Sequence, residues 1–260
     1  MNILISNDDG IGAIGIKILS QELAQKHNVY IVAPDREKSA KSQALTIHSP
    51  LRVKEITDND FGAKKVWTVS GTPVDCVKIG ISTILSEDEK PDVVISGINH
   101  GPNLGHDVRY SGTVGAALEG SMLGYPSIAV SLAAIKSEPK NFIYPAKFML
   151  EFLDEYTPIN PKTTLNINFP KVEENEIRGV LITQLAERIF TSQYEKHTDP
   201  QGKEYYWLAG KVANDEQYRQ TDFYAIKNNH ISITPLNYNM TDFNSMQPLS
   251  KIFDKQTVLP

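Results

Sequence analysis

Two adjacent aspartates, Asp8 and Asp9, follow the first apolar segment of the chain, residues 2–6, and a glycine comes directly after them. If that segment is a strand of an open α/β sheet, the carboxylates stand at its carboxyl end, where such sheets bind ligands. Two like charges about 4 Å apart repel by about 4 kcal/mol at an effective dielectric constant of about 20. A hard divalent cation takes oxygen ligands and offsets this repulsion. The pair therefore predicts a metal site at the end of the first strand.

Further oxygen donors follow two later strand-like segments. Ser39 lies in the loop after residues 29–33, and Asn99 lies in the loop after residues 92–96. Because the carboxyl ends of parallel strands meet at one edge of a sheet, we expect these donors to converge with the aspartates. Carboxylate, hydroxyl and amide oxygens suit magnesium or manganese rather than zinc. Each residue alone has an ordinary explanation as a cap or turn residue, so the prediction rests on their joint occurrence.

A fourth loop leads into a predicted helix that begins with Ser111, Gly112 and Thr113. The free N–H groups and the dipole of a helix N-terminus attract anions such as phosphate, and glycine permits close backbone approach. The alternative for Ser111 is an ordinary N-cap. A cation opposite a phosphate-binding helix end predicts phosphoryl hydrolysis, in which the metal polarises a phosphoryl oxygen and lowers the pKa of a bound water.

The expected catalytic residues are Asp8, Asp9 and Asn99, and Asn99 is also expected to bind the phosphate. A water activated by the metal is the preferred nucleophile. Direct attack by an aspartate is the alternative, since aspartyl phosphates form in other phosphoryl-transfer enzymes. His100 and His106 follow Asn99 in the same loop, and either could act as a general acid. A loop histidine is more often merely exposed, so the identity of the general acid stays open.

A competing pattern overlaps the first loop. Gly10, Gly12 and Gly15 fit the G-x-G-x-x-G fingerprint of dinucleotide-binding folds, and Asp35 lies about 20 residues further on. Alone, this pattern predicts an NAD-binding oxidoreductase. A pyrophosphate over Gly10 would, however, meet two carboxylates with no cation between them, so the charges favour the metal site. A nucleotide sensor that binds without turnover is a third alternative.

The composition is that of an ordinary globular protein: 260 residues, 40% hydrophobic and 22% charged. A net charge of -5 argues against binding of nucleic acid polymers, which usually requires a basic face. The single cysteine, Cys76, excludes an internal disulfide and is expected to be a small buried hydrophobe rather than a nucleophile. No apolar run is long enough to span a bilayer and the N-terminus lacks signal-peptide features, so we expect a cytoplasmic protein with no membrane partner.

Strand-like and helix-like segments alternate along the first part of the chain, which predicts a mostly parallel sheet with helices on both faces. The expected strands are residues 2–6, 29–33, 51–56, 66–70, 92–96 and 127–132. The expected helices are residues 14–25, 73–85, 111–123 and 141–156. The predicted fold class is therefore α/β, a Rossmann-like three-layer sandwich, with residues 1–170 as its catalytic core.

Residues 171–260 have a different character. Short strand-like runs occur at residues 179–183, 205–208 and 230–234, and apolar residues recur at helical spacing after Asn239. This pattern predicts a β-rich extension and an amphipathic C-terminal helix, both suited to contact with a neighbouring subunit.

The loops above resemble those of the SurE family of metal-dependent nucleotidases, the stationary-phase survival proteins. The similar segments are residues 3–10, 32–36 with Ser39, 70–77, 96–105, 110–117, 199–202 with 205–208, and 221–222 with 232–236. The resemblance covers nearly the whole chain. It implies removal of phosphate from nucleoside monophosphates at the 5′ position, with breadth to the 3′ position and to short polyphosphate.

The resemblance also implies one divalent metal ion per subunit, magnesium or manganese, held by Asp8, Asp9, Ser39 and Asn99. It implies a homodimer or homotetramer in which C-terminal elements are exchanged between subunits. The preferred base, the choice between 5′ and 3′ phosphates and the native metal stay open. One departure is Ala40, where many members have glycine, because a left-handed backbone there would be strained for alanine and would alter the shape of the loop.

Overall fold

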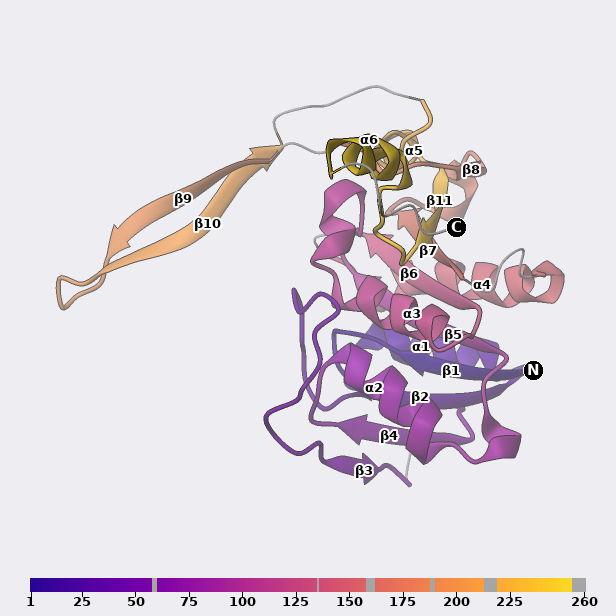
Figure 1. The fold of residues 1–260 in the computed structure, drawn as a ribbon. Helices are drawn as coiled ribbons and strands as arrows, with labels where there is room; N and C mark the ends of the chain where they lie inside the picture. The colour runs from indigo at the N-terminus through magenta and orange to yellow at the C-terminus, as the bar shows by residue number, and fades with distance from the viewer. Residues whose placement is uncertain (58–59, 135, 158–161, 188–189, 213–218, 254–260) are drawn as a thin grey trace.

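A mostly parallel sheet forms the centre of the molecule (Figure 1). The computed structural model describes residues 1–57, 60–134, 136–157, 162–187, 190–212 and 219–253. The strands of this sheet are β1 (Asn2–Ser6), β2 (Asn28–Pro34), β3 (Val53–Glu55), β4 (Lys65–Val69), β5 (Val93–His100), β6 (Ser127–Ala133), β7 (Thr163–Pro170), β8 (Val180–Ile182) and β11 (Ile231–Asn237). Their order is β3-β4-β2-β1-β5-β6-β7-β11-β8, and only β3–β4 and β7–β11 pair antiparallel.

Helices cover both faces of the sheet (Figure 1). On one face α1 (Ile14–Leu23) packs against α4 (Ile143–Glu155), and on the other α2 (Pro73–Ile79) packs against α3 (Gly112–Met122). Strand β1 serves both layers because its side chains alternate: Ile3 and Ile5 join the core under α1 and α4, whereas Leu4 joins the core under α2. The three-layer α/β fold predicted from the sequence is confirmed.

Two elements of this core differ from the predicted segments. The helix that begins at Pro73 is α-helical only to Ile79 and continues as a π-helical turn over Gly80–Ile84. Strand β5 was expected to end at Ser96, yet it runs to His100 with an irregular register against β6 between Ser96 and Asn99. Asn99 therefore lies on the end of a strand rather than in a following loop, which restricts its position more tightly.

Strand β7 was not predicted, although its sequence carries a strand-like alternation. Thr164, Asn166 and Asn168 alternate with apolar residues, as they would in a strand with one face in water. In the structure all three polar side chains are buried, because α3 and the loop after β5 cover this face of the sheet. The interior face of the strand is polar here and needs hydrogen-bond partners, which the site described below supplies.

The C-terminal part of the chain adds β8 and β11 to the main sheet and one short helix, α5 (Asp222–Lys227). Strands β9 (Phe190–Thr198) and β10 (Glu204–Val212) form an antiparallel hairpin that projects away from the sheet (Figure 1, orange). The amphipathic tail forms α6 (Phe243–Phe253), as predicted, whereas β9 and α5 were not predicted. The domain boundary at residue 170 and the exchange of this part between subunits stay predictions. Over the described ranges, no helix combines the length and the apolar character needed to cross a membrane.

The order of the strands fixes where a ligand binds. From β1 the chain moves to β2 and β4 on one side and then returns to β5 on the other side of β1. Ligands of open α/β sheets bind at the carboxyl ends of the strands where the order reverses. The loops after β1 and β2, the end of β5 and the start of α3 all meet at this point.

Candidate metal and phosphate site

Asp8 lies at the carboxyl end of β1 against the N-terminus of α3, with 4% of its surface exposed. The Thr113 hydroxyl donates a hydrogen bond to Asp8 Oδ1. Burial raises the pKa of Asp8, and hydrogen bonds from the Thr113 hydroxyl and the backbone N–H groups of Thr113 and Gly112 partly oppose that rise. The start of α3 thus orients this carboxylate.

Asp9 is half-buried, and its Oδ2 accepts a hydrogen bond of 3.0 Å from the backbone N–H of His100. Burial raises the pKa of Asp9 to about 6, and the negative charge of Asp8 acts in the same direction. Two neighbouring carboxylates that both resist ionisation create a position where added positive charge is favourable. A divalent cation between them would supply that charge.

Ser39 is exposed in the loop after β2. The start of this loop lies against the residues that follow β1, because the Lys38 N–H donates a hydrogen bond of 2.7 Å to the backbone oxygen of Asp8. The Ser39 hydroxyl donates its proton to Glu37 Oε1 at 2.7 Å, which leaves its oxygen lone pairs for a cation. The backbone contact of its neighbour Lys38 places Ser39 on the same side of the sheet as Asp8, and its role as a metal ligand stays a prediction.

The backbone of this loop is left-handed at two residues other than glycine, Ala40 with φ 55° and Ser42 with φ 54°. The unfavourable conformation anticipated at Ala40 is therefore present. Such a residue costs about 1–2 kcal/mol, so the loop keeps its shape only where its surroundings hold it.

Asn99 approaches the aspartates from β5. Its Nδ2 donates to the Gly101 oxygen at 2.8 Å, so the amide oxygen is the atom left for a cation. The hydrogen bond from His100 to Asp9 ties the end of β5 to the end of β1. The side chains of His100 and His106 are both exposed, and the structure does not select one of them as a general acid.

The three residues predicted to bind phosphate lie at the start of α3 beside Asp8. Ser111 is the N-cap, and its Oγ accepts a hydrogen bond of 3.1 Å from the Val114 N–H. A Cβ added to Gly112 would lie 2.9 Å from the Cβ of Asp8 and 3.0 Å from its Oδ2, so this close approach requires glycine. The hydroxyl of Thr113 is engaged with Asp8. The side chains of Ser111 and Thr113 are thus occupied within the protein itself.

The glycines of the dinucleotide-like pattern have packing explanations. A Cβ at Gly10 would lie 2.7 Å from the backbone carbon of Arg36, and a Cβ at Gly15 would lie 2.0 Å from the oxygen of Ile98. Gly12 has no atom within 4 Å of such a Cβ. Close contact of Gly10 with the loop after β2, and of Gly15 in α1 with β5, therefore accounts for two of the three glycines without a bound dinucleotide.

The donors present fit a hard cation. Among the described residues, no group of three or more His, Cys, Asp or Glu side chains could hold a metal ion. A cation at this site would rely on two carboxylates and on neutral oxygens from Ser39 and Asn99. An all-oxygen set suits magnesium or manganese. Cys76 is fully buried in α2, and burial raises the pKa of its thiol well above the usual value, in keeping with a hydrophobic role.

Three side chains that hold the loop after Asn99, those of Asn166, Asn168 and Asp222, were given no role from the sequence. The Asn103 N–H donates to Asn168 Oδ1 at 2.9 Å, and its oxygen accepts from Asn166 Nδ2 at 2.8 Å. Asp222 Oδ2 accepts from the N–H of Gly105 at 2.7 Å. The alternating asparagines of β7 are a signal that could have indicated a buried polar network. No residue near Asp222 in the sequence indicates its partner, the backbone N–H of Gly105.

Comparisons with known proteins point to one family. A sequence model for the family described as "Survival protein SurE" matches residues 3–192. A protein named 5'-nucleotidase SurE from Kosmotoga olearia is 47% identical over 254 residues, which cover 96% of this chain and 98% of that protein. Another of that name from Synechococcus elongatus is 44% identical over 260 residues, covering 97% and 99%.

A solved structure also resembles this chain along nearly its whole length. The crystal structure of the SurE protein from Aquifex aeolicus superposes with a TM-score of 0.82 at 37% sequence identity, covering 97% of this chain and 99% of that one. The loops at the carboxyl ends of β1, β2 and β5 and the start of α3 fall within the segment that the family model matches. By sequence and by fold, this chain belongs to the SurE family.

Proposed function

We propose that this protein is a metal-dependent phosphomonoesterase that removes phosphate from nucleoside monophosphates, and that it is a 5′-nucleotidase. The observation that carries the proposal is the pair formed by the buried carboxylate of Asp8 and the half-buried carboxylate of Asp9 at the carboxyl end of β1, where burial raises the pKa of both. The relatives named 5'-nucleotidase SurE, which match nearly the full chain, support the choice of substrate.

In this proposal Asp8, Asp9, Ser39 and Asn99 hold one divalent cation, magnesium or manganese. When bound, such a cation polarises a phosphoryl oxygen and lowers the pKa of an attacking water. The chain itself positions the ligands. Thr113 orients the carboxylate of Asp8, and the backbone of His100 orients that of Asp9.

The proposed phosphate-binding residues are Ser111, Gly112 and Thr113 at the start of α3, together with Asn99 of β5. Since the Ser111 and Thr113 oxygens already have partners, the backbone N–H groups and the helix dipole are the features of this helix end that suit an anion. Water is the preferred nucleophile. Attack by Asp8 or Asp9 would instead give an acid-stable or trappable phosphoenzyme during turnover, and rapid quenching with labelled substrate separates the two.

One assay tests the function. Purified protein is incubated with AMP and manganese, with and without EDTA, and released phosphate is measured. We expect release that requires metal and that is lost in Asp9→Asn. The matched control is Asp35→Asn, since Asp35 is an exposed carboxylate at the end of β2 that pairs with Arg36 at 3.9 Å. Phosphate release that continues in EDTA would contradict the proposal. Metal-dependent binding of AMP without phosphate release would favour a nucleotide sensor that binds without turnover.

Three further features belong to the proposal. Activity on 3′-nucleotides and short polyphosphate is expected from the family. Phosphate release from a panel of these substrates tests it. A homodimer or homotetramer that exchanges C-terminal elements is supported by exposed apolar side chains, such as Trp207 of β10 at 66% and Ile252 of α6 at 72% exposure. Light scattering at several protein concentrations tests that assembly. A cytoplasmic location is consistent with a single cysteine and no possible internal disulfide.

A further inference from the structure

The loop that carries Ser39 leaves the metal site and crosses two helices, and it is fastened along the way. The N–H of Ser42 donates to the Tyr110 oxygen at 3.0 Å, and its Oγ donates to the Arg109 oxygen at 2.6 Å. A Cβ on Gly115 of α3 would lie 2.6 Å from the Ser42 oxygen, so glycine allows the loop to rest directly on this helix.

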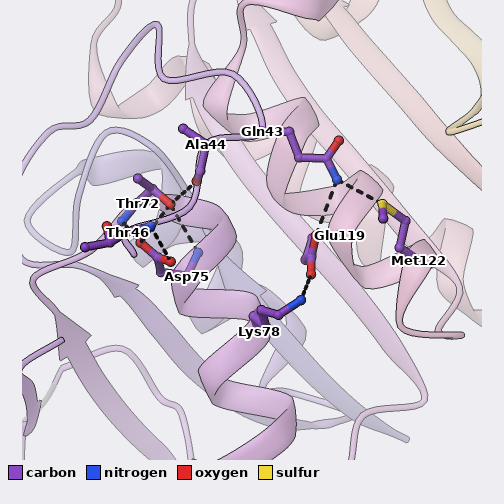
Figure 2. Close-up of polar contacts among 8 residues, drawn as sticks. All are labelled: Gln43, Ala44, Thr46, Thr72, Asp75, Lys78, Glu119 and Met122. Atoms are coloured by element: carbon purple, nitrogen blue, oxygen red, sulfur yellow. Dashed lines mark hydrogen bonds and ion pairs between the residues drawn. The ribbon is translucent and has the colours of Figure 1, made fainter. Parts of the chain in front are cut away.

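The next fastening is a buried carboxylate on α3. Glu119 is 3% exposed, and its Oε2 accepts a hydrogen bond of 3.3 Å from Gln43 Nε2. Its Oε1 pairs with Lys78 Nζ of α2 at 2.7 Å. Figure 2 shows Gln43 and Lys78 reaching Glu119 from opposite sides, with Met122 Sδ 3.1 Å from the same Gln43 nitrogen. One carboxylate thus joins the loop, α3 and α2.

A second buried carboxylate fixes the far end of the same loop. Asp75 accepts from the Thr46 N–H at 3.1 Å and from the Thr72 N–H at 2.8 Å (Figure 2). The Thr72 hydroxyl donates to the Ala44 oxygen at 2.7 Å. Because Asp75 and Thr72 also form the N-terminal capping box of α2, altering either would disturb that helix. The contact between Gln43 and Glu119 is the fastening that can be tested by itself.

The fastenings matter because the loop is strained. Ala40 and Ser42 both have a left-handed backbone, and they lie between Ser39 and Gln43. A strained segment of this kind persists only when its surroundings determine its shape. Loss of the Gln43 hydrogen bond would remove one of the restraints on the strained residues 40–42, and a shift of this backbone would move the Ser39 oxygen.

We propose that Gln43 and Glu119 are positioning residues for Ser39: their hydrogen bond restrains the strained loop that carries Ser39, and it thereby contributes to the affinity for the divalent cation. Neither residue touches the cation. The inference rests on the proposed function, in which Ser39 is a metal ligand. Gln43 is half-buried on a loop, so its substitution leaves the core intact.

The test measures binding of manganese to the full chain by calorimetry, together with the melting temperature and phosphate release from AMP. Gln43→Ala should weaken manganese binding roughly 3- to 10-fold, the net range of one ordinary intramolecular hydrogen bond, since the bond of 3.3 Å to Glu119 is long. Gln43→Glu places a like charge beside Glu119 and should weaken binding further. In both variants saturating manganese should restore most of the turnover, while the melting temperature changes little.

Lys78→Met is the matched control. It removes the other partner of Glu119 and leaves Gln43 in place, so we expect a lower melting temperature with manganese affinity close to that of the wild type. Unchanged affinity in both Gln43 variants would overturn the inference, and so would equal losses of affinity in Gln43→Ala and Lys78→Met. If the wild type failed to bind manganese, or if Asp9→Asn bound it as tightly, the proposed function itself would fall and the inference with it.

Discussion

The carboxylate of Asp222 in α5 accepts a hydrogen bond of 2.7 Å from the backbone N–H of Gly105, which belongs to the loop after Asn99. The same side chain is fully buried and accepts from the N–H of Ala186 at 2.9 Å and of Phe223 at 2.8 Å. A single residue from the C-terminal part of the chain therefore holds one of the loops that form the proposed metal site.

The first prediction concerns Asp222→Asn. Asparagine keeps the shape but turns an N–H donor toward one of the three backbone N–H groups, which is left unsatisfied. We expect a loss of roughly 1–3 kcal/mol in the free energy of unfolding and faster amide exchange in residues 99–109. Denaturant titration and hydrogen exchange by mass spectrometry measure the two effects.

Asp199→Asn is the control for this prediction. Asp199 accepts two backbone hydrogen bonds, from Gln201 at 2.8 Å and Lys203 at 2.9 Å, in the exposed turn between β9 and β10. Its substitution should leave exchange in residues 99–109 unchanged. Wild-type protection of that loop in Asp222→Asn would contradict the prediction, and it would show that the hydrogen bonds of Asn103 are enough to hold the loop.

The second prediction concerns the hydroxyl of Thr113. Thr113→Val preserves the shape of the side chain but removes the donor to Asp8, so the pKa of Asp8 rises further and the carboxylate loses its orientation. We expect metal affinity and kcat/KM to fall roughly 10- to 100-fold, the range for partners that orient metal ligands. Thr113→Ser retains the hydroxyl and should stay close to wild type. Equal activity of the valine and serine variants would exclude this role.

The third prediction is a pH dependence of stability without metal. In the folded protein the pKa of Asp9 is about 6, above its ordinary value of 3.8, so the folded state holds the proton more tightly. This contribution to stability is complete below about pH 4 and is lost as the pH rises through about 6. In EDTA at pH 7.5, Asp9→Asn should therefore be more stable than the wild type by roughly 1–3 kcal/mol.

Denaturant titrations of both proteins at pH 4 and pH 7.5 provide the measurement, and the difference between them isolates Asp9 from other carboxylates. The two proteins should be equally stable at the lower pH. Saturating manganese at the higher pH should stabilise the wild type alone, because only the wild type binds it. A variant that is less stable than the wild type at pH 7.5 in EDTA would contradict the prediction.

The fourth prediction separates the metal site from the dinucleotide alternative. Gly12→Ala adds a Cβ that meets no atom within 4 Å, so we expect unchanged stability and phosphate release. Gly15→Ala is the contrasting variant, since its Cβ would lie 2.0 Å from the oxygen of Ile98, and it should lower the melting temperature. Fluorescence titration should detect no NAD binding to the wild type. Tight NAD binding that Gly12→Ala abolishes would revive the alternative.

Much of the fold could be predicted because its signals are local. The apolar run before Asp8, the proline after Thr72 and the glycine after Ser111 each mark the end or start of an element in adjacent residues. An alternation of strands and helices then implies a parallel sheet, and a parallel sheet brings successive strand ends together. The aspartates and Asn99 could be assigned to one edge on that basis.

The missed features depend on contacts between distant parts of the chain. Whether the hydroxyl of Thr113 faces phosphate or Asp8 depends on the rotation of α3 over β1, which no neighbouring residue reports. The burial of the polar face of β7 was missed because the hydrogen-bond partner of Asn166, the backbone oxygen of Asn103, is 63 residues away in the sequence. The extension of β5 to His100 likewise depends on pairing with β6. Local propensity does not encode such pairings.

All the proposed metal and phosphate ligands lie between residues 8 and 113. The loop that follows the ligand Asn99 is nevertheless held by Asp222, which lies much later in the chain. A ribosome that adds roughly 5–20 residues per second needs roughly 5–20 seconds to extend the chain from Thr113 to Asp222. During that interval the nascent polypeptide carries every ligand but lacks the acceptor for the Gly105 N–H. The order of synthesis thus delays completion of the site until most of the C-terminal segment has emerged.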